Sequence, residues 1–194
     1  MPPRKNYNGK ANDKGLTASY FIKRNNLVKH AVAPDGSCWI SVILATLGMY
    51  KTKVKRGGGL NIKATPDEQI LANDIRQHLV PKFGAAIADS PVYVNGELEK
   101  LGAYGGDEHW QVLAPLFNLF VILWDPREYG IHMNTQRHKF ICVFPDGKLK
   151  LKDALEIQNA IKANKMTDDP ATVVHAAWSN TIPDHFDVYL IRKA

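Results

Sequence analysis

The sequence contains little cysteine and no hydrophobic segment long enough to cross a membrane. Its two cysteines, Cys38 and Cys142, lie far apart and cannot form the disulfide framework of a small secreted protein, so we expect a reducing compartment. The longest apolar run, residues 112–124, is interrupted by Pro115 and Asn118 and is shorter than the ~20 residues of a membrane-spanning helix. The first residues also lack the apolar stretch of a secretory signal. These absences predict an intracellular, cytoplasmic protein without a membrane partner.

The motifs of several enzyme classes are also missing. There is no CxxC pair and no HExxH, so a zinc site would need scattered ligands. The run Gly57-Gly58-Gly59 lacks the Lys-Ser/Thr that follows a phosphate-binding loop. No GxSxG is present, which excludes a serine esterase elbow. The sequence therefore offers no motif for a metal or an organic cofactor.

The net charge of +6 is confined to the start of the chain. Residues 1–30 hold seven Lys/Arg and one Asp, and the remainder holds 18 Lys/Arg and 18 Asp/Glu. We interpret residues 1–26 as a basic flexible lead-in or short N-terminal helix, and residues 27–194 as one domain. Since residues 31–194 carry no net charge, we do not expect nucleic acid as the partner of the domain, although the lead-in stays a candidate polyanion-binding segment.

Apolar patterning predicts helices and strands in a mixed order. Expected helices cover 16–25, 38–48, 65–80, 108–117 and 153–165, and expected strands cover 27–33, 119–124, 140–144, 172–178 and 186–191. In the third helix, an apolar face is expected from Ile70, Leu71, Ile75 and Leu79. Residues 49–61 are expected to form a loop. Early helices and late strands favour an α/β or α+β fold with a central mixed or antiparallel sheet flanked by helices.

Cys38 is the first candidate for chemistry. It follows the polar turn Asp35-Gly36-Ser37 and opens an apolar helix. A helix N-terminus favours the thiolate and is expected to lower the pKa of the thiol, and its free N–H groups can hold an oxyanion. The alternative is a structural cysteine at the start of a core helix. Cys142, inside an apolar strand, is expected to be core.

A nucleophilic cysteine needs a base, and His185 is the best placed histidine for that role. It stands at the start of the last predicted strand. Residues two apart in a strand point the same way, so Asp187 would share its face and could orient the imidazole. The alternative is a polar edge strand with paired side chains. The residues therefore suggest a Cys38–His185–Asp187 triad.

Three motifs, in this order, resemble those of the ovarian tumour (OTU) family, a papain-like group of cysteine deubiquitinases. They are Asp35-Gly36-Ser37-Cys38-Trp39, then Tyr104-Gly105-Gly106-Asp107 leading into a helix and strand, and His185-Phe186-Asp187. The resemblance covers residues 27–194. It departs from the family pattern at Tyr104, where Trp is usual, at His109, where Glu is common, and in residues 148–170, which have no clear counterpart.

The resemblance implies a papain-like OTU fold and hydrolysis of the bond after the C-terminal glycine of ubiquitin. It implies an oxyanion hole from backbone N–H groups around Asp35, Gly36 and Ser37. The expected residues of the channel for the ubiquitin tail are Trp39, Tyr104, Gly105, Gly106, Asp107 and Phe186. The partners would be ubiquitin and polyubiquitin chains, and the protein would act as a monomer. A domain this compact would suit a viral or bacterial effector in host cytoplasm as well as a housekeeping enzyme.

Two alternatives stay open at this point. The chain could be a non-enzymatic OTU-like module that binds ubiquitin or, through its lead-in, nucleic acid. It could also be a protease for another ubiquitin-like modifier. The intact set of Cys38, His185 and Asp187 favours an enzyme, because packing alone does not require all three residue types.

Overall fold

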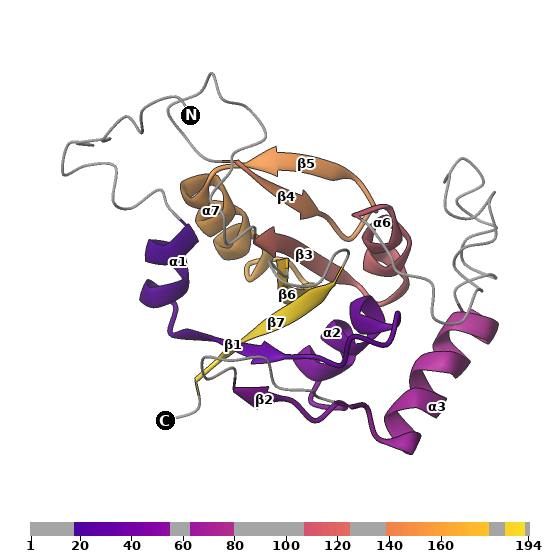
Figure 1. Cartoon of the computed structure of the whole chain (residues 1–194). Helices are drawn as coiled ribbons and strands as arrows, with labels where there is room; N and C mark the ends of the chain where they lie inside the picture. Colours follow the sequence, from indigo (N-terminus) through magenta and orange to yellow (C-terminus); the bar gives the residue numbers. More distant parts are fainter. Residues whose placement is uncertain (1–17, 55–62, 80–106, 125–138, 179–184, 193–194) are drawn as a thin grey trace, which may run out of the picture.

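The computed structural model describes residues 18–54, 63–79, 107–124, 139–178 and 185–192. Within these ranges seven strands form one sheet with the order β2-β1-β7-β6-β3-β4-β5 (Figure 1). The strands are β1 (Leu27–Ala31), β2 (Lys53–Val54), β3 (Leu119–Trp124), β4 (Phe140–Val143), β5 (Leu149–Lys152), β6 (Thr172–Trp178) and β7 (Phe186–Ile191). The pairing of β3 with β6 is parallel and the other pairings are antiparallel. The predicted mixed α/β class is confirmed.

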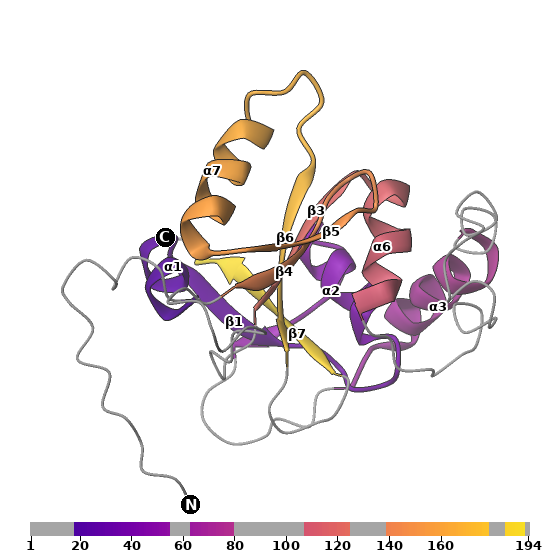
Figure 2. The ribbon, with the colours of Figure 1, turned by 90° about the horizontal axis from the view of Figure 1, so that it is seen from above.

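Helices cover both faces of this sheet. They are α1 (Ala18–Arg24), α2 (Cys38–Thr46), α3 (Pro66–Asp74) with the π-helical turn η2 (Ile75–Leu79), α6 (Asp107–Leu116) and α7 (Ala154–Asn164). Figure 2 shows α1 and α7 on one side of the strands and α2, α3 and α6 on the other. No helix in the described ranges combines the length and hydropathy of a membrane span.

The sheet separates two hydrophobic cores. One lies under α2 and α6, and the other lies under α1 and α7. Every residue of β3 is buried, as expected for a central strand covered on both faces. In the second core Phe21 of α1 packs on Trp124 with ring centroids 4.8 Å apart. The described part of the predicted lead-in therefore packs with the domain.

Helix α2 positions the candidate nucleophile. Its residues from Cys38 to Ala45 are all buried, in keeping with a sequence that is apolar on nearly every face. Its end is marked by Gly48, whose φ of +77° belongs to the left-handed region that glycine adopts readily. Because α2 packs against β7 and β6, its first residue lies near the start of the last strand.

The expected apolar face of the third helix is confirmed at Ile75, which is buried, and at Leu71, which packs against the core, but it is wrong at Ile70 and Leu79. Ile70 and Leu79 are 58% and 47% exposed, whereas Glu68 and Arg76 are buried together with Ala72 and Ile75. A π-helical turn holds more residues than an α-helical turn, so the face that meets the core rotates after Ile75 and leaves Leu79 outside it. The buried polar groups have partners, which offsets the cost of their burial.

Two short edge strands were not expected. Lys53–Val54 lies inside the predicted loop 49–61 and pairs with β1 as β2, and Leu149–Lys152 pairs with β4 as β5. Both are too short or too polar for a clear alternation of buried and exposed residues, and their pairing depends on distant partners. Residues 55–61 of the predicted loop lie outside the described residues.

Candidate active site

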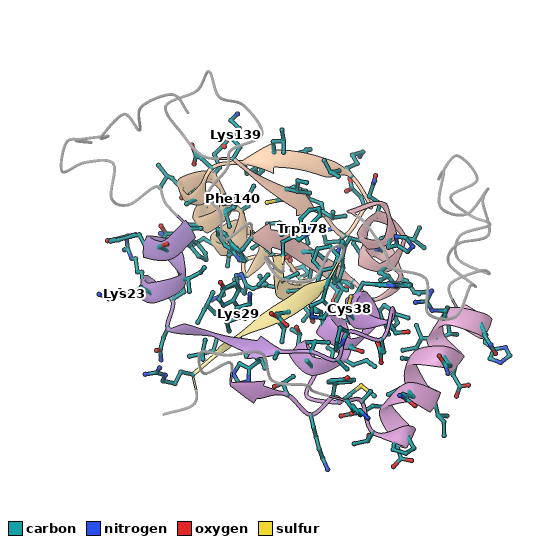
Figure 3. The ribbon with its side chains drawn as sticks, viewed as in Figure 1. Lys23, Lys29, Cys38, Lys139, Phe140 and Trp178 are labelled. Carbon is teal, nitrogen blue, oxygen red and sulfur yellow. The ribbon has the colours of Figure 1, made fainter. Side chains whose placement is uncertain are left out.

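Cys38 is the first residue of α2 and lies beside the start of β7 (Figure 3). Its sulfur is hydrogen-bonded by the backbone N–H groups of Phe186 and Trp39. The residue is 0% exposed. Burial raises the pKa of the Cys38 thiol to about 12, and the negative charges of Asp35 and Asp187 act in the same direction, against those two N–H groups. The prediction of a lowered thiol pKa is therefore wrong for this closed arrangement, because desolvation outweighs the helix N-terminus.

His185 and Asp187 are in contact, as the two-residue spacing predicts. His185 Nε2 lies 3.2 Å from Asp187 Oδ1, and both side chains are buried. An ionised carboxylate only accepts hydrogen bonds, so Nε2 carries the proton and donates it. In the neutral imidazole Nδ1 is then a free base. Among the described residues Nδ1 has no hydrogen-bond partner.

Donors from three described residues contact the Asp187 carboxylate. Besides His185, the backbone N–H of Val32 donates to Oδ1 at 3.2 Å, and Lys29 Nζ lies 3.2 Å from Oδ2. Burial opposes the charged carboxylate, but the His185 hydrogen bond, the Lys29 charge and the Val32 N–H outweigh it. Together they hold the pKa of Asp187 well below its usual range. Asp187 is thus an anion at neutral pH that fixes the imidazole.

The turn before Cys38 is held by its own hydrogen bonds. Ser37 N–H donates to Asp35 Oδ1 at 3.0 Å, and Gly36 adopts a φ of +80°. The Gly36 carbonyl accepts from Trp39 Nε1 at 3.1 Å and from Arg76 at 2.9 Å. Ser37 makes no side-chain cap to the helix. The Ser37 N–H predicted for the oxyanion hole is committed to Asp35 in this arrangement, so an oxyanion would rely on other N–H groups of the turn or helix start.

The predicted channel residues are described only in part. Trp39 and Phe186 are 0% exposed, so neither side chain presents surface for a substrate tail in this structure, contrary to the prediction that they line a channel. Phe186 meets Trp110 edge-on at 5.6 Å. Asp107 is the first residue of α6. Tyr104, Gly105 and Gly106 lie outside the described residues.

His109, one departure from the family pattern, packs against the site. Its ring lies 4.8 Å from that of Trp39. Burial lowers the pKa of His109 to about 4, and the nearby Arg76 charge adds to the effect. His109 is therefore neutral at pH 7 and acts as packing.

Arg76 is a residue that the sequence reasoning missed. It belongs to the turn η2, is 0% exposed and donates to the turn before Cys38. The signal available in the sequence was weak, because Arg76 stands four residues after Ala72 on a face that looked merely amphipathic. A buried arginine next to a candidate nucleophile adds a positive charge to the site.

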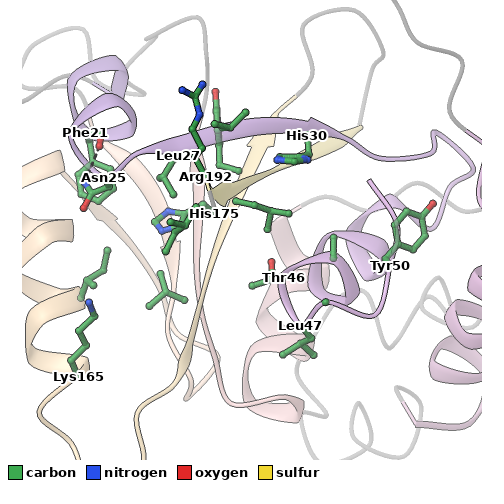
Figure 4. A pocket seen from close by; sticks show the side chains of 18 residues that line it. Phe21, Asn25, Leu27, His30, Thr46, Leu47, Tyr50, Lys165, His175 and Arg192 are labelled. Atoms are coloured by element: carbon green, nitrogen blue, oxygen red, sulfur yellow. Dashed lines mark hydrogen bonds between the residues drawn. The ribbon is translucent and has the colours of Figure 1, made fainter. Parts of the chain in front are cut away.

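A pocket of about 1060 Å³ lies away from the candidate catalytic residues (Figure 4). It opens where β6 and β7 diverge beyond the pair His175 and Tyr189, between α7 and the end of α2. Its lining includes neither Cys38 nor His185. His175 accepts a hydrogen bond from Trp124 at 3.1 Å, and burial lowers the pKa of His175 to about 4. His175 is half-buried and lines this pocket, which is separate from the candidate chemistry.

The described residues contain no group of three or more His, Cys, Asp or Glu that could hold a metal ion. No family model, curated protein or solved structure matches the chain. The likeness to the OTU family therefore rests on the three motifs. Their first and last members meet in space, since Cys38 contacts the Phe186 backbone between His185 and Asp187.

Proposed function

We propose that the protein is a deubiquitinating thiol protease of the OTU type with a papain-like fold, acting in the cytoplasm. The observation that carries the proposal is the convergence of Cys38, His185 and Asp187. The thiol stands at a helix N-terminus, and an imidazole oriented by a carboxylate begins the neighbouring strand. Nucleophilic catalysis by cysteine uses these three groups, and His185 Nδ1, which has no hydrogen-bond partner among the described residues, must meet the sulfur when the substrate binds. The motif order supports ubiquitin as the substrate.

The residues account for each proton and bond of the reaction. His185 Nδ1 takes the proton of the Cys38 thiol, and the thiolate attacks the carbonyl carbon of the C-terminal glycine of ubiquitin. The C–N bond then breaks, and the imidazolium gives its proton to the leaving lysine amine. Water, deprotonated by His185, hydrolyses the thioester, and the thiol is regenerated. Asp187 keeps Nε2 protonated and stabilises the imidazolium throughout.

The closed site requires an opening step before attack. The Cys38 sulfur has no exposed surface, so a substrate carbonyl must displace neighbouring atoms to reach it. The Phe186 and Trp39 N–H groups already contact the sulfur, so they can donate hydrogen bonds to the thiolate once it forms. We expect substrate binding, rather than the resting enzyme, to bring the nucleophile into its reactive state.

Substrate class is tested with fluorogenic amides. We expect release of a fluorophore attached to the C-terminus of ubiquitin, inhibited by a thiol reagent. The same fluorophore on another ubiquitin-like modifier, and on a short peptide of the ubiquitin tail, provides the comparison. Release from the other modifier alone would favour the alternative protease. No release from any of them would favour a non-enzymatic binding module.

Lys29 is expected to set the pH dependence of the reaction. Lys29→Met removes a cation that lies 3.2 Å from Asp187 Oδ2 and so lessens the positive charge beside the catalytic pair. The acid limb of kcat/KM should move up by about half a pH unit, a small effect because Lys29 is partly exposed to solvent. The measurement is the pH profile of fluorophore release.

The matched control is Lys148→Met, which removes a surface cation paired with Asp146 at the turn between β4 and β5. Its profile should coincide with that of the wild type. If the acid limb of kcat/KM in Lys29→Met also coincides with that of the wild type, Lys29 does not influence the base.

A further inference from the structure

Arg76 needs a physical explanation because its side chain is fully buried. It is 0% exposed, and burial lowers the pKa of the Arg76 guanidinium, against the negative charges at Cys38 and Asp35. An arginine stays protonated in proteins nonetheless. Burying such a cation is costly unless anions, acceptors or aromatic faces compensate it.

The compensating contacts lie on the segment that carries the nucleophile. One guanidinium nitrogen of Arg76 donates to the Gly36 carbonyl at 2.9 Å and approaches Ser37 Oγ at 3.4 Å. The guanidinium carbon lies 4.6 Å from the centre of the Trp39 ring, a cation–π distance. These three residues flank Cys38 on both sides. A planar, multi-donor cation thus ties η2 to the turn and to the first residues of α2.

The other charged groups around Cys38 do not favour a negative charge on its sulfur. Asp35 and Asp187 both oppose a negative charge on the sulfur. His109 is neutral, so it supplies no counter-charge. His185 becomes positive only after it has taken the proton. Arg76 is a fixed positive charge of the described residues, and the negative charges of Cys38 and Asp35 favour its charged form.

We propose that Arg76 is a positioning residue for the nucleophile: it holds the turn Asp35-Gly36-Ser37 and supplies the permanent positive charge that stabilises the Cys38 thiolate. The catalytic consequence rests on the proposed function. The effect on the thiol does not, because ionisation of Cys38 is measurable without any ubiquitin substrate. Failure of the two ideas can therefore be told apart.

The experiment follows the alkylation of Cys38 by iodoacetamide as a function of pH. Peptide mapping by mass spectrometry separates Cys38 from Cys142. In Arg76→Met we expect the midpoint of the rate profile to rise by about one pH unit or more, as for loss of a close opposite charge. At pH 7 this corresponds to alkylation about tenfold slower or more.

Arg76→Lys separates the charge from the hydrogen bonds. Lysine keeps the positive charge. Its compact ammonium cannot both reproduce the hydrogen-bond geometry of the planar guanidinium and stack on the Trp39 ring. We expect its alkylation midpoint to stay within about half a unit of wild type, while kcat/KM on the ubiquitin amide falls about tenfold through misplacement of the turn. Circular dichroism and thermal unfolding verify that each variant is folded.

A folded Arg76→Met with an unchanged midpoint would overturn the inference. If Arg76→Met does not fold, Arg76→Lys decides it alone: a wild-type midpoint with reduced kcat/KM supports the proposal, and wild-type values of both overturn it. If ubiquitin amides are not cleaved by any form, the midpoint shift in Arg76→Met still tests the charge. A shift without cleavage would then refute the substrate class and retain the role of Arg76.

Discussion

Cys38→Ala is expected to abolish release of a fluorophore from the C-terminus of ubiquitin. Without the sulfur no thioester forms, and the imidazole alone cannot replace a covalent nucleophile. Loss of a nucleophile of this kind lowers the rate by at least about 10⁴-fold. The fold should persist, because alanine fills the first position of α2 without a clash and the site keeps its His185–Asp187 contact. Steady-state kinetics at matched protein concentration measure the effect.

The second cysteine provides the matched control. Cys142 lies in β4, is 0% exposed and has its thiol pKa raised to about 12 by burial. Cys142→Ala should lose a little stability through a small cavity but retain kcat/KM. If Cys142→Ala is inactive while Cys38→Ala is active, the nucleophile has been misassigned.

His185→Gln is the second substitution with a large expected effect. Glutamine can still donate an amide N–H to Asp187, so the buried carboxylate keeps a partner. It cannot accept the thiol proton or return a proton to the leaving amine. General acid–base catalysis supplies about 10²–10⁴ of the rate, and here one group serves both steps. We expect kcat to fall by about 10³-fold or more with a smaller change in KM.

The control for this variant is His78→Gln, at an exposed position of η2, which should retain full activity. A His185→Gln enzyme that keeps more than about a tenth of the wild-type kcat would mean that another group is the base. Thiol alkylation adds a check, since Cys38 should still react with iodoacetamide at high pH.

Local patterns predicted much of what positions the site. The apolar run at 38–48 and its glycine end predict α2, and the continuous apolar run of 119–124 predicts a strand buried on both faces. The alternation of strand side chains brings His185 and Asp187 onto one face. The helix expected over 153–165 is found as α7, which begins with a capping box of Asp153 and Glu156. Each of these depends on residues close in sequence.

The remainder depends on contacts between distant segments. The raised pKa of the Cys38 thiol comes from burial among other elements, which the helix N-terminus alone does not reveal. The position of the Arg76 side chain depends on the π-helical geometry of η2 and on its hydrogen bond to Gly36, 40 positions earlier in the chain. The pairing of Lys29 with Asp187 joins β1 to β7. Patterns within one segment contain none of this information.

The most direct test of the proposed function uses ubiquitin whose C-terminus carries a thiol-trapping electrophile. Incubated with the wild-type protein and examined by intact-mass spectrometry, it should give a stable adduct of one ubiquitin per chain, and peptide mapping should place the bond at Cys38. Cys38→Ala should give none. If the wild type forms no adduct although iodoacetamide alkylates Cys38, or if the adduct survives in Cys38→Ala, the protein is not a Cys38-dependent deubiquitinase.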